Sequence, residues 1–91
     1  MSVSVRVPTI LRPYTQGASE VSVEGSTLTE VLDSLDTSYP GIKSRVLDES
    51  GQLRRFVNVY VDNDDVRFAE GLQTTVAEGG QVSIIPAVAG G

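Results

Sequence analysis

Residues 27–35, Thr-Leu-Thr-Glu-Val-Leu-Asp-Ser-Leu, contain the signal that decides the fold. Thr27 and Glu30 have the spacing of a capping box, in which the threonine hydroxyl accepts from the Glu30 amide and the glutamate carboxylate reaches back over the first turn. The apolar residues stand at i, i+3, i+4 and i+7: Leu28, Val31, Leu32 and Leu35. The segment therefore predicts an amphipathic helix whose apolar stripe must be covered by another layer of structure.

Two strands are predicted on the N-terminal side of this helix. Every second residue is valine in residues 3–7 and again in residues 21–23, which is the period that places side chains on one face of a strand. Pro8 ends the first strand, and residues 9–17 contain a proline and a glycine that indicate a turn or wide loop. The two strands therefore suggest a hairpin.

On the C-terminal side, the sequence Tyr-Pro-Gly at residues 39–41 ends the helix, and residues 42–47 predict a short second helical turn. Residues 53–61 form the longest predicted strand, which we expect in the interior of the sheet. A polar turn at residues 62–64 and a short strand at 66–68 should follow. The last predicted strand covers residues 82–85, after a turn at Gly79-Gly80, and Pro86 closes it.

The order of these elements predicts an α+β domain of the β-grasp type, with a mixed sheet of four to five strands and one main helix across one face. We expect this domain to cover residues 1–86. Residues 87–91, Ala-Val-Ala-Gly-Gly, are too small and glycine-rich to form an element, so we expect a flexible C-terminal tail.

Composition excludes several kinds of chemistry. The 91 residues include no Cys and no His, which removes thiol nucleophiles, imidazole bases and the usual soft metal ligands. The acidic residues Asp62, Asp64 and Asp65 lack the glycine and distal glutamate of a calcium loop, so a solvated turn is favoured and no metal or bound cofactor is expected. A net charge of −5 disfavours nucleic acid, and without a long apolar run we expect a cytoplasmic protein and no membrane partner.

The chain resembles the ubiquitin-like sulfur carrier family, which includes the small subunit of molybdopterin synthase and the thiamine-pathway carrier. Its similarity is greatest to the branch that serves thiocarboxylate-dependent cysteine biosynthesis. The residues that carry the resemblance form four segments: 8–13 (PTILRP), 55–61 (RFVNVYV), 65–68 (DVRF) and 82–91 (VSIIPAVAGG). In a β-grasp order, a terminal Gly-Gly one short step past the last strand is a specific motif.

The resemblance implies a carrier protein and not an enzyme. A ubiquitin-activating-type partner would adenylate the Gly91 carboxylate with ATP, and a sulfur donor would convert the acyl adenylate to a thiocarboxylate. Gly90, Ala89, Val88 and Ala87 would be the recognised tail. The acceptor enzyme would be a pyridoxal phosphate-dependent sulfhydrylase of the cysteine synthase type, and a metalloprotease would release the cysteine.

Three alternatives remain open from the sequence. The chain resembles the molybdopterin synthase small subunit through the same features, and a protein modifier that is conjugated to lysines uses the same activated glycine. A non-covalent interaction module would not need the terminal glycines. Deleting Gly91 separates this last class from the others.

A docking surface is predicted on the open face of the sheet, because one helix covers only the other face. If the valines of the 53–61 strand face the helix, Phe56 and Tyr60 point outward beside Ile85 and form an apolar patch. The arginines at positions 12, 54, 55 and 67 can pair with an acidic partner or with local carboxylates such as Glu49 and Asp65, and we interpret them as structural.

Overall fold

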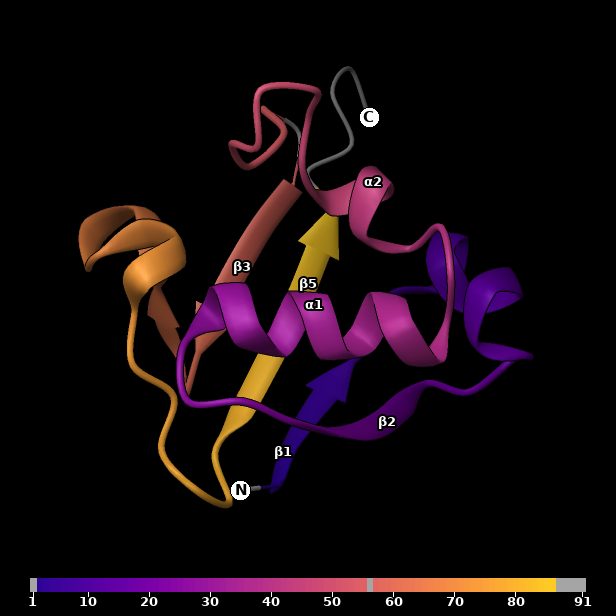
Figure 1. The fold of residues 1–91 in the computed structure, drawn as a ribbon, viewed down its shortest axis with the longest axis horizontal. Coiled ribbons are helices and arrows are strands. Elements are labelled where there is room, and N and C mark those ends of the chain that lie inside the picture. Colours follow the sequence, from indigo (N-terminus) through magenta and orange to yellow (C-terminus); the bar gives the residue numbers. More distant parts are fainter. Residues whose placement is uncertain (1, 56, 87–91) are drawn as a thin grey trace.

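The computed structural model describes residues 2–55 and 57–86. In this part of the chain a five-stranded mixed sheet has α1 lying across one face (Figure 1). The strands are β1 (Ser2–Arg6), β2 (Glu20–Glu24), β3 (Val57–Val61), β4 (Asp64–Asp65) and β5 (Gln81–Pro86). The α-helices are α1 (Leu28–Ser38) and α2 (Lys43–Val46), and the 3-10 helices are η1 (Thr9–Thr15), η2 (Val66–Phe68) and η3 (Gly71–Gln73).

The strands lie in the order β2-β1-β5-β3-β4, so the last strand of the chain occupies the middle of the sheet. β1 pairs with β2 in an antiparallel hairpin and with β5 in a parallel arrangement. β3 is antiparallel to β5 and also to the two-residue β4. This is the predicted β-grasp plan, and β3 has neighbours on both sides as expected of an interior strand.

The core forms between α1 and the sheet face that it covers (Figure 1). The predicted helical stripe is fully buried at Leu28, Val31, Leu32 and Leu35. The valines at the alternating strand positions are buried beneath it: Val3, Val5, Val21, Val23, Val57, Val59, Val61 and Val82. Both sequence periods are confirmed, since the helical period of 3.6 and the strand period of two converge on one apolar layer.

The N-terminus of α1 has a modified capping box. The Glu30 amide donates to the Thr27 hydroxyl at 3.3 Å, as predicted. The Glu30 carboxylate reaches one residue further back than in the usual motif and accepts from the amide and hydroxyl of Ser26, at 2.9 and 2.8 Å. These two hydrogen bonds lower the pKa of the Glu30 carboxyl, because they favour its ionised form.

Three element predictions were wrong in detail. Residues 9–15 form η1 where a loop was expected, and Pro13 fits inside it because a short 3-10 turn needs few backbone donors. The predicted 53–61 strand begins only at Val57, since Leu53 forms an isolated bridge with Leu47 and the Arg54 amide donates to the Val46 carbonyl.

The predicted strand at residues 66–68 is η2. Asp62 and Asn63 have positive φ values of 50° and 82°, which close a tight turn that leaves only Asp64 and Asp65 paired with β3. The Asp65 side chain then accepts from the Arg67 amide at 2.9 Å and caps the helical turn.

Candidate functional site at the end of strand β5

The candidate site lies where β5 ends. Gly91, Gly90, Ala89, Val88 and Ala87 lie outside the described residues, as does Phe56. The position from which the tail leaves is described, because Pro86 pairs with Val57 as the last residue of β5. β1 and β5 are parallel, so the carboxyl ends of both strands lie at the same end of the sheet as Pro86.

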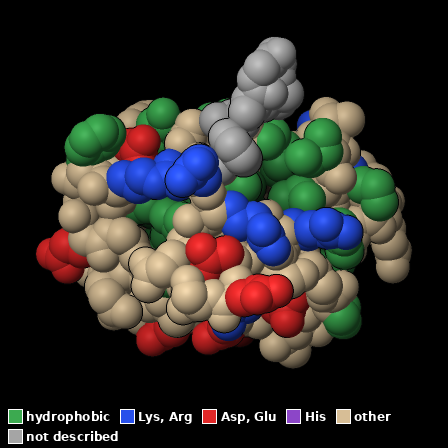
Figure 2. All heavy atoms as spheres, turned by 90° about the horizontal axis from the view of Figure 1, so that it is seen from above, with side chains coloured by type: hydrophobic (Ala, Val, Ile, Leu, Met, Phe, Trp, Pro, Cys, Tyr) green, Lys and Arg blue, Asp and Glu red, His purple; other side chains and the backbone are tan. Residues whose placement is uncertain are grey.

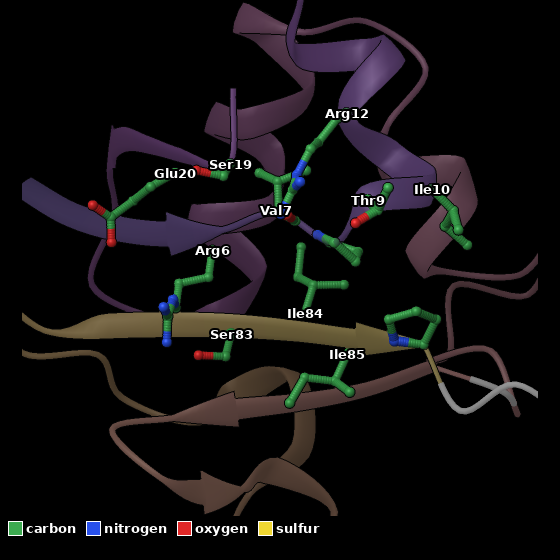
Figure 3. Close-up of a pocket in the computed structure, with 12 residues that line it drawn as sticks. Arg6, Val7, Thr9, Ile10, Arg12, Ser19, Glu20, Ser83, Ile84 and Ile85 are labelled. Carbon is green, nitrogen blue, oxygen red and sulfur yellow. Dashed lines mark hydrogen bonds between the residues drawn. The ribbon is translucent and has the colours of Figure 1, made fainter. Parts of the chain in front are cut away.

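An open groove of about 640 Å³ runs along this edge, between η1 and the ends of β1 and β5 (Figure 3). Its lining comes from three parts of the chain: Arg6, Val7, Pro8, Thr9, Ile10 and Arg12 around β1 and η1; Ser19 and Glu20 at β2; and Ser83, Ile84, Ile85 and Pro86 of β5. The groove therefore borders the residue that precedes the tail.

One end of the groove is apolar and the other is charged. Val7 and Ile84 form a buried base, while Ile10 and Ile85 expose 64% and 47% of their surface near Pro86. Arg6 and Glu20, which are register partners on β1 and β2, provide the charged end. Exposed branched side chains close to Pro86 are suited to contact with a partner protein.

The open face of the sheet carries the described members of the predicted docking surface. Tyr60 and Ile85 alternate with the buried residues of β3 and β5, so both point away from α1. Asn58 is directly opposite Ile85, and Tyr60 is opposite Ser83, which makes Tyr60 and Ile85 diagonal neighbours. Their role in docking remains a prediction.

Sequence reasoning missed two exposed apolar residues, Ile10 and Phe68. Phe68 ends η2 with 91% of its surface exposed, and Ile10 lies on η1 in the groove. Both belong to segments whose 3-10 structure the sequence did not reveal. A usable signal for Ile10 is that it lies outside any helical or strand period, in a segment expected to be a loop. Phe68 alternates with Val66 in the predicted strand at residues 66–68, which hid its exposure.

Two carboxyl groups among the described residues have a lowered pKa. Hydrogen bonds from Ser26 lower the pKa of Glu30, and the Ser50 hydroxyl and then the Gln52 amide lower that of Asp48. Glu30 lies in the first turn of α1 and Asp48 in an exposed loop, and neither lines the groove. Among residues 2–55 and 57–86, no group of His, Cys, Asp and Glu is arranged to hold a metal ion.

None of the helices in the described part of the chain has the length and hydropathy needed to span a bilayer. The candidate site is an open surface where β1 and β5 end.

Comparison with known proteins extends over the whole chain. The sequence model of the ThiS family matches residues 5–91. The sulfur carrier protein CysO of Mycobacterium tuberculosis is 53% identical over 93 residues, which cover 100% of both chains.

Two solved structures have the same fold. A chain in the crystal structure of the Amycolatopsis orientalis BexX/CysO complex matches with a TM-score of 0.92 and 46% identity, covering 98% of this chain and 99% of that one. The crystal structure of M. tuberculosis CysO matches with a TM-score of 0.91 and 51% identity, covering 94% and 99%. The first of these relatives was solved together with a partner protein.

Proposed function

Because the chain belongs to the ThiS family, we propose that it is a sulfur carrier protein that serves cysteine biosynthesis through its Gly91 carboxylate. The full-length similarity to the sulfur carrier protein CysO carries this proposal. The groove and exposed apolar residues beside Pro86 support it, since a carrier must bind other proteins close to its reacting end. The chain itself is a co-substrate that partner enzymes act on.

The chemistry needs no base from this chain. An α-carboxyl has a reference pKa of about 3.3 to 3.7, so at neutral pH a terminal glycine is ionised and its oxygen can attack the α-phosphate of ATP, with pyrophosphate leaving. A sulfur nucleophile then attacks the acyl carbon and AMP leaves, which gives the thiocarboxylate. ATP and the activating enzyme supply the energy and the catalytic groups, in agreement with a sequence that has no His and no Cys.

The fold explains how the reacting carbon reaches a partner. A fully extended five-residue segment spans at most about 16 to 18 Å, so residues 87–91 are long enough to enter an active site while the domain docks outside. Glycine at the last two positions presents no side chain to a narrow channel. The domain therefore positions the terminus, and the partner performs the reaction.

We assign the partners by their chemistry. A ubiquitin-activating-type enzyme adenylates and thiolates Gly91, and a pyridoxal phosphate-dependent sulfhydrylase receives the sulfur. In that second step the thiocarboxylate displaces the leaving group from an activated serine, an acyl shift gives a peptide-bonded cysteine, and a metalloprotease releases it. The crystal structure of a relative with BexX supports protein partners in general.

The test is intact-mass analysis after incubation with ATP, a sulfide source and a ubiquitin-activating-type enzyme. We expect the mass to rise by the difference between one sulfur and one oxygen atom. Deleting Gly91 should abolish the gain, whereas the control variant Thr37→Ala, at an exposed position of α1, should keep it. Normal thiolation of the truncated chain, or none of the intact chain, would contradict the proposal.

The acceptor is identified in a second reaction. The purified thiocarboxylate is incubated with O-phosphoserine or O-acetylserine and a sulfhydrylase, and a gain of one cysteine residue on the chain is expected. If the thiocarboxylate forms isopeptide bonds with lysines of added proteins instead, the chain is a protein modifier. If the acceptor is a molybdopterin precursor, it is a molybdopterin synthase subunit.

A further inference from the structure

Arginine side chains gather at the end of the molecule where β5 finishes. Seen from this end, Lys and Arg side chains form a broken row across the surface, and most acidic side chains lie below that row (Figure 2). Hydrogen bonds join the segments that carry four arginines: α2 to η1 through Arg45 and Tyr14, Arg54 to Ser44 of α2, and Arg67 of η2 to the Arg54 carbonyl. The four are Arg12 of η1, Arg45, Arg54 and Arg67. We refer to these four residues as the arginine surface.

Each arginine of this surface is fixed by an uncharged oxygen. Arg12 Nε donates to the Val7 carbonyl at 3.3 Å, and Arg54 Nε donates to the Ser44 carbonyl at 3.0 Å. Arg45 Nε donates to the Tyr14 hydroxyl at 2.6 Å, with the guanidinium 5.7 Å from the ring centroid. Arg67 donates to Asn58 Oδ1 at 2.6 Å and to the Arg54 carbonyl at 2.8 Å.

The carboxylates that the sequence offered as partners do not pair with these arginines. Within the described residues, none of the four guanidinium groups has a carboxylate oxygen within 4.0 Å; the ion pair present there joins Lys43 to Asp33. Asp65 instead accepts from the backbone amide of Arg67. Glu49 forms no ion pair with them either. Of the two kinds of partner that the sequence allowed, local carboxylates and an acidic partner protein, the described residues therefore do not provide the first.

The remaining acidic groups of this end are already engaged in turns. Asp48 accepts from Ser50 and Gln52, and the charge of Arg54 is the smallest of the influences that lower its pKa. Asp36 accepts from the amides of Gly41 and Lys43. These carboxylates thus stabilise the loops, and among the described residues none of them comes within 4.0 Å of the four guanidinium groups, although the charge of Arg54 still acts on Asp48.

This arrangement is organised for an ionic contact with another molecule. A neutral acceptor fixes the position of a guanidinium and reduces the entropy lost on binding, but it does not cancel the charge. A guanidinium has five N–H donors, so each of these groups retains donors for a bidentate bond to a carboxylate. The positive surface stands out in a chain whose net charge is −5.

We propose that the arginine surface docks against a carboxylate-rich surface of the protein that activates Gly91, an inference that rests on the proposed function. The location supports this partner, because Arg54 precedes Val57 by three residues and Val57 pairs with Pro86, the last residue before the tail. A nucleic acid is disfavoured, since the net negative charge of the chain repels a polyphosphate. The contact steers the partner to the end of the domain from which the tail leaves.

The first test is the salt dependence of thiolation. Electrostatic steering raises association rates by about 10-fold or more at low ionic strength and weakens as salt screens the charges. We expect kcat/KM for thiolation of the native chain to fall about tenfold between about 0.03 and 0.3 M NaCl. The double variant Arg45→Gln/Arg54→Gln should lose most of this salt dependence of kcat/KM. Its kcat, measured when the carrier saturates the activating enzyme, should be unchanged.

Two further double variants serve as controls. Ser2→Glu/Ala77→Glu makes the same change in net charge at the opposite edge of the sheet, where the Gly79 amide donates to the Ser2 carbonyl, and it should retain the native salt dependence. Arg45→Lys/Arg54→Lys keeps the charges and should retain most of the rate. An effect of the lysine pair equal to that of the glutamine pair would indicate a structural role and overturn the proposal.

A second experiment needs no partner enzyme. Hexaglutamate is titrated into the labelled chain while the Nε–H signals of the arginines are followed by NMR. We expect shifts at Arg12, Arg45, Arg54 and Arg67 and smaller ones at Arg6, which faces Glu20 across the strand pair. Equal shifts at all arginines, or tighter binding of a six-nucleotide oligothymidine, would overturn the inference.

The outcomes separate the inference from the proposed function. Absence of thiolation in the native chain contradicts the sulfur carrier assignment, and with it the activating partner of this inference. Thiolation that is independent of salt and of the arginine variants overturns the inference alone.

Discussion

Gly25 shows how one residue without a side chain allows the helix to approach the sheet. A Cβ at this position would lie 2.7 Å from the Val31 amide nitrogen and 2.9 Å from Val31 Cγ2. Both atoms belong to the first turns of α1, whose capping residues follow Gly25 directly. The turn from β2 into α1 therefore has no room for a side chain at Gly25. The obstructing atoms include the helix backbone, which cannot move aside as a flexible side chain could.

We expect Gly25→Ala to destabilise the protein by about 1 to 3 kcal/mol, the usual cost of forcing an extra methyl group into a packed site. Urea denaturation followed by circular dichroism measures this difference. Ser22→Ala, on the exposed side of β2, is the control and should change the free energy of unfolding by less than about 0.5 kcal/mol. An unchanged midpoint for Gly25→Ala would show that α1 can shift without cost.

Glu30 gives a prediction about pH. Hydrogen bonds from Ser26 lower its pKa in the folded chain below the ordinary value of 4.5, so ionised Glu30 stabilises the fold above that value. This stabilisation is lost as the pH falls from 4.5 through the lower folded pKa. We expect native protein to be more stable than Glu30→Gln at pH 7, and the difference should shrink over the acidic window.

Paired urea titrations of the two proteins across the acidic range provide the measurement. The lowered pKa of Asp48 is common to both proteins and cancels in the comparison. A stability difference that stays constant with pH would show that the Glu30 contacts do not depend on its charge.

Individual residues also show which features the sequence could predict and which it could not. The core valines and leucines were predictable because each belongs to a period. Ile10 belongs to none, and the strand period predicted for residues 66–68 gave Phe68 the wrong structure. Arg67 donates to Asn58, nine positions away, which only the folded β3–β4 turn brings within reach. Contacts between segments without a period are set by the tertiary structure, and local patterns do not contain them.

At the scale of elements, α1 was the most predictable segment because two independent signals coincide there. The cap at Thr27 fixes where it begins, and the apolar stripe fixes which face it buries. The 3-10 segment η1 has neither signal, and η2 has only the Asp65 cap over a turn of three residues. They are held by side-chain contacts such as the Thr15 hydroxyl, which donates to the Arg12 and Ala18 carbonyls at 3.2 and 2.8 Å.

The stripe on α1 predicts a large effect of shortening one of its side chains. Leu32 is completely buried between the helix and the sheet, so Leu32→Ala should destabilise the protein by about 2 to 5 kcal/mol. Thermal unfolding followed by calorimetry measures this loss of stability. Thr37→Ala, at an exposed position of the same helix, is the control. Equal losses for the two variants would mean that α1 does not depend on its apolar stripe.

The whole molecule places its first and last strands side by side and in parallel (Figure 1). Consequently Ser2 lies at the end of the sheet where β5 begins, and Pro86 lies at the opposite end. The element order predicted this β-grasp topology because one amphipathic helix must cover a sheet assembled from both halves of the chain. The distribution of charge at the two edges was not predictable, since it depends on which segments fold back onto the end of β5.

This separation predicts that the two termini differ in their tolerance of additions. A folded domain fused before residue 1 should leave thiolation by the activating enzyme within about twofold of the native rate, since about 20 Å of β5 separates the fusion from Pro86. One additional residue after Gly91 should abolish it. Intact-mass analysis distinguishes the two fusions, and loss of thiolation in the N-terminal fusion would show that the opposite edge also contacts the enzyme.

The central position of β5 has a consequence for biosynthesis. A ribosome that has not yet delivered residues 81–86 has produced β1 and β3 without the strand that joins them, so the emerging polypeptide lacks a continuous sheet. Folding must then wait until residues 81–86 have been made. Truncated polypeptides that lack these residues should be digested rapidly by a protease, while polypeptides that contain them should resist.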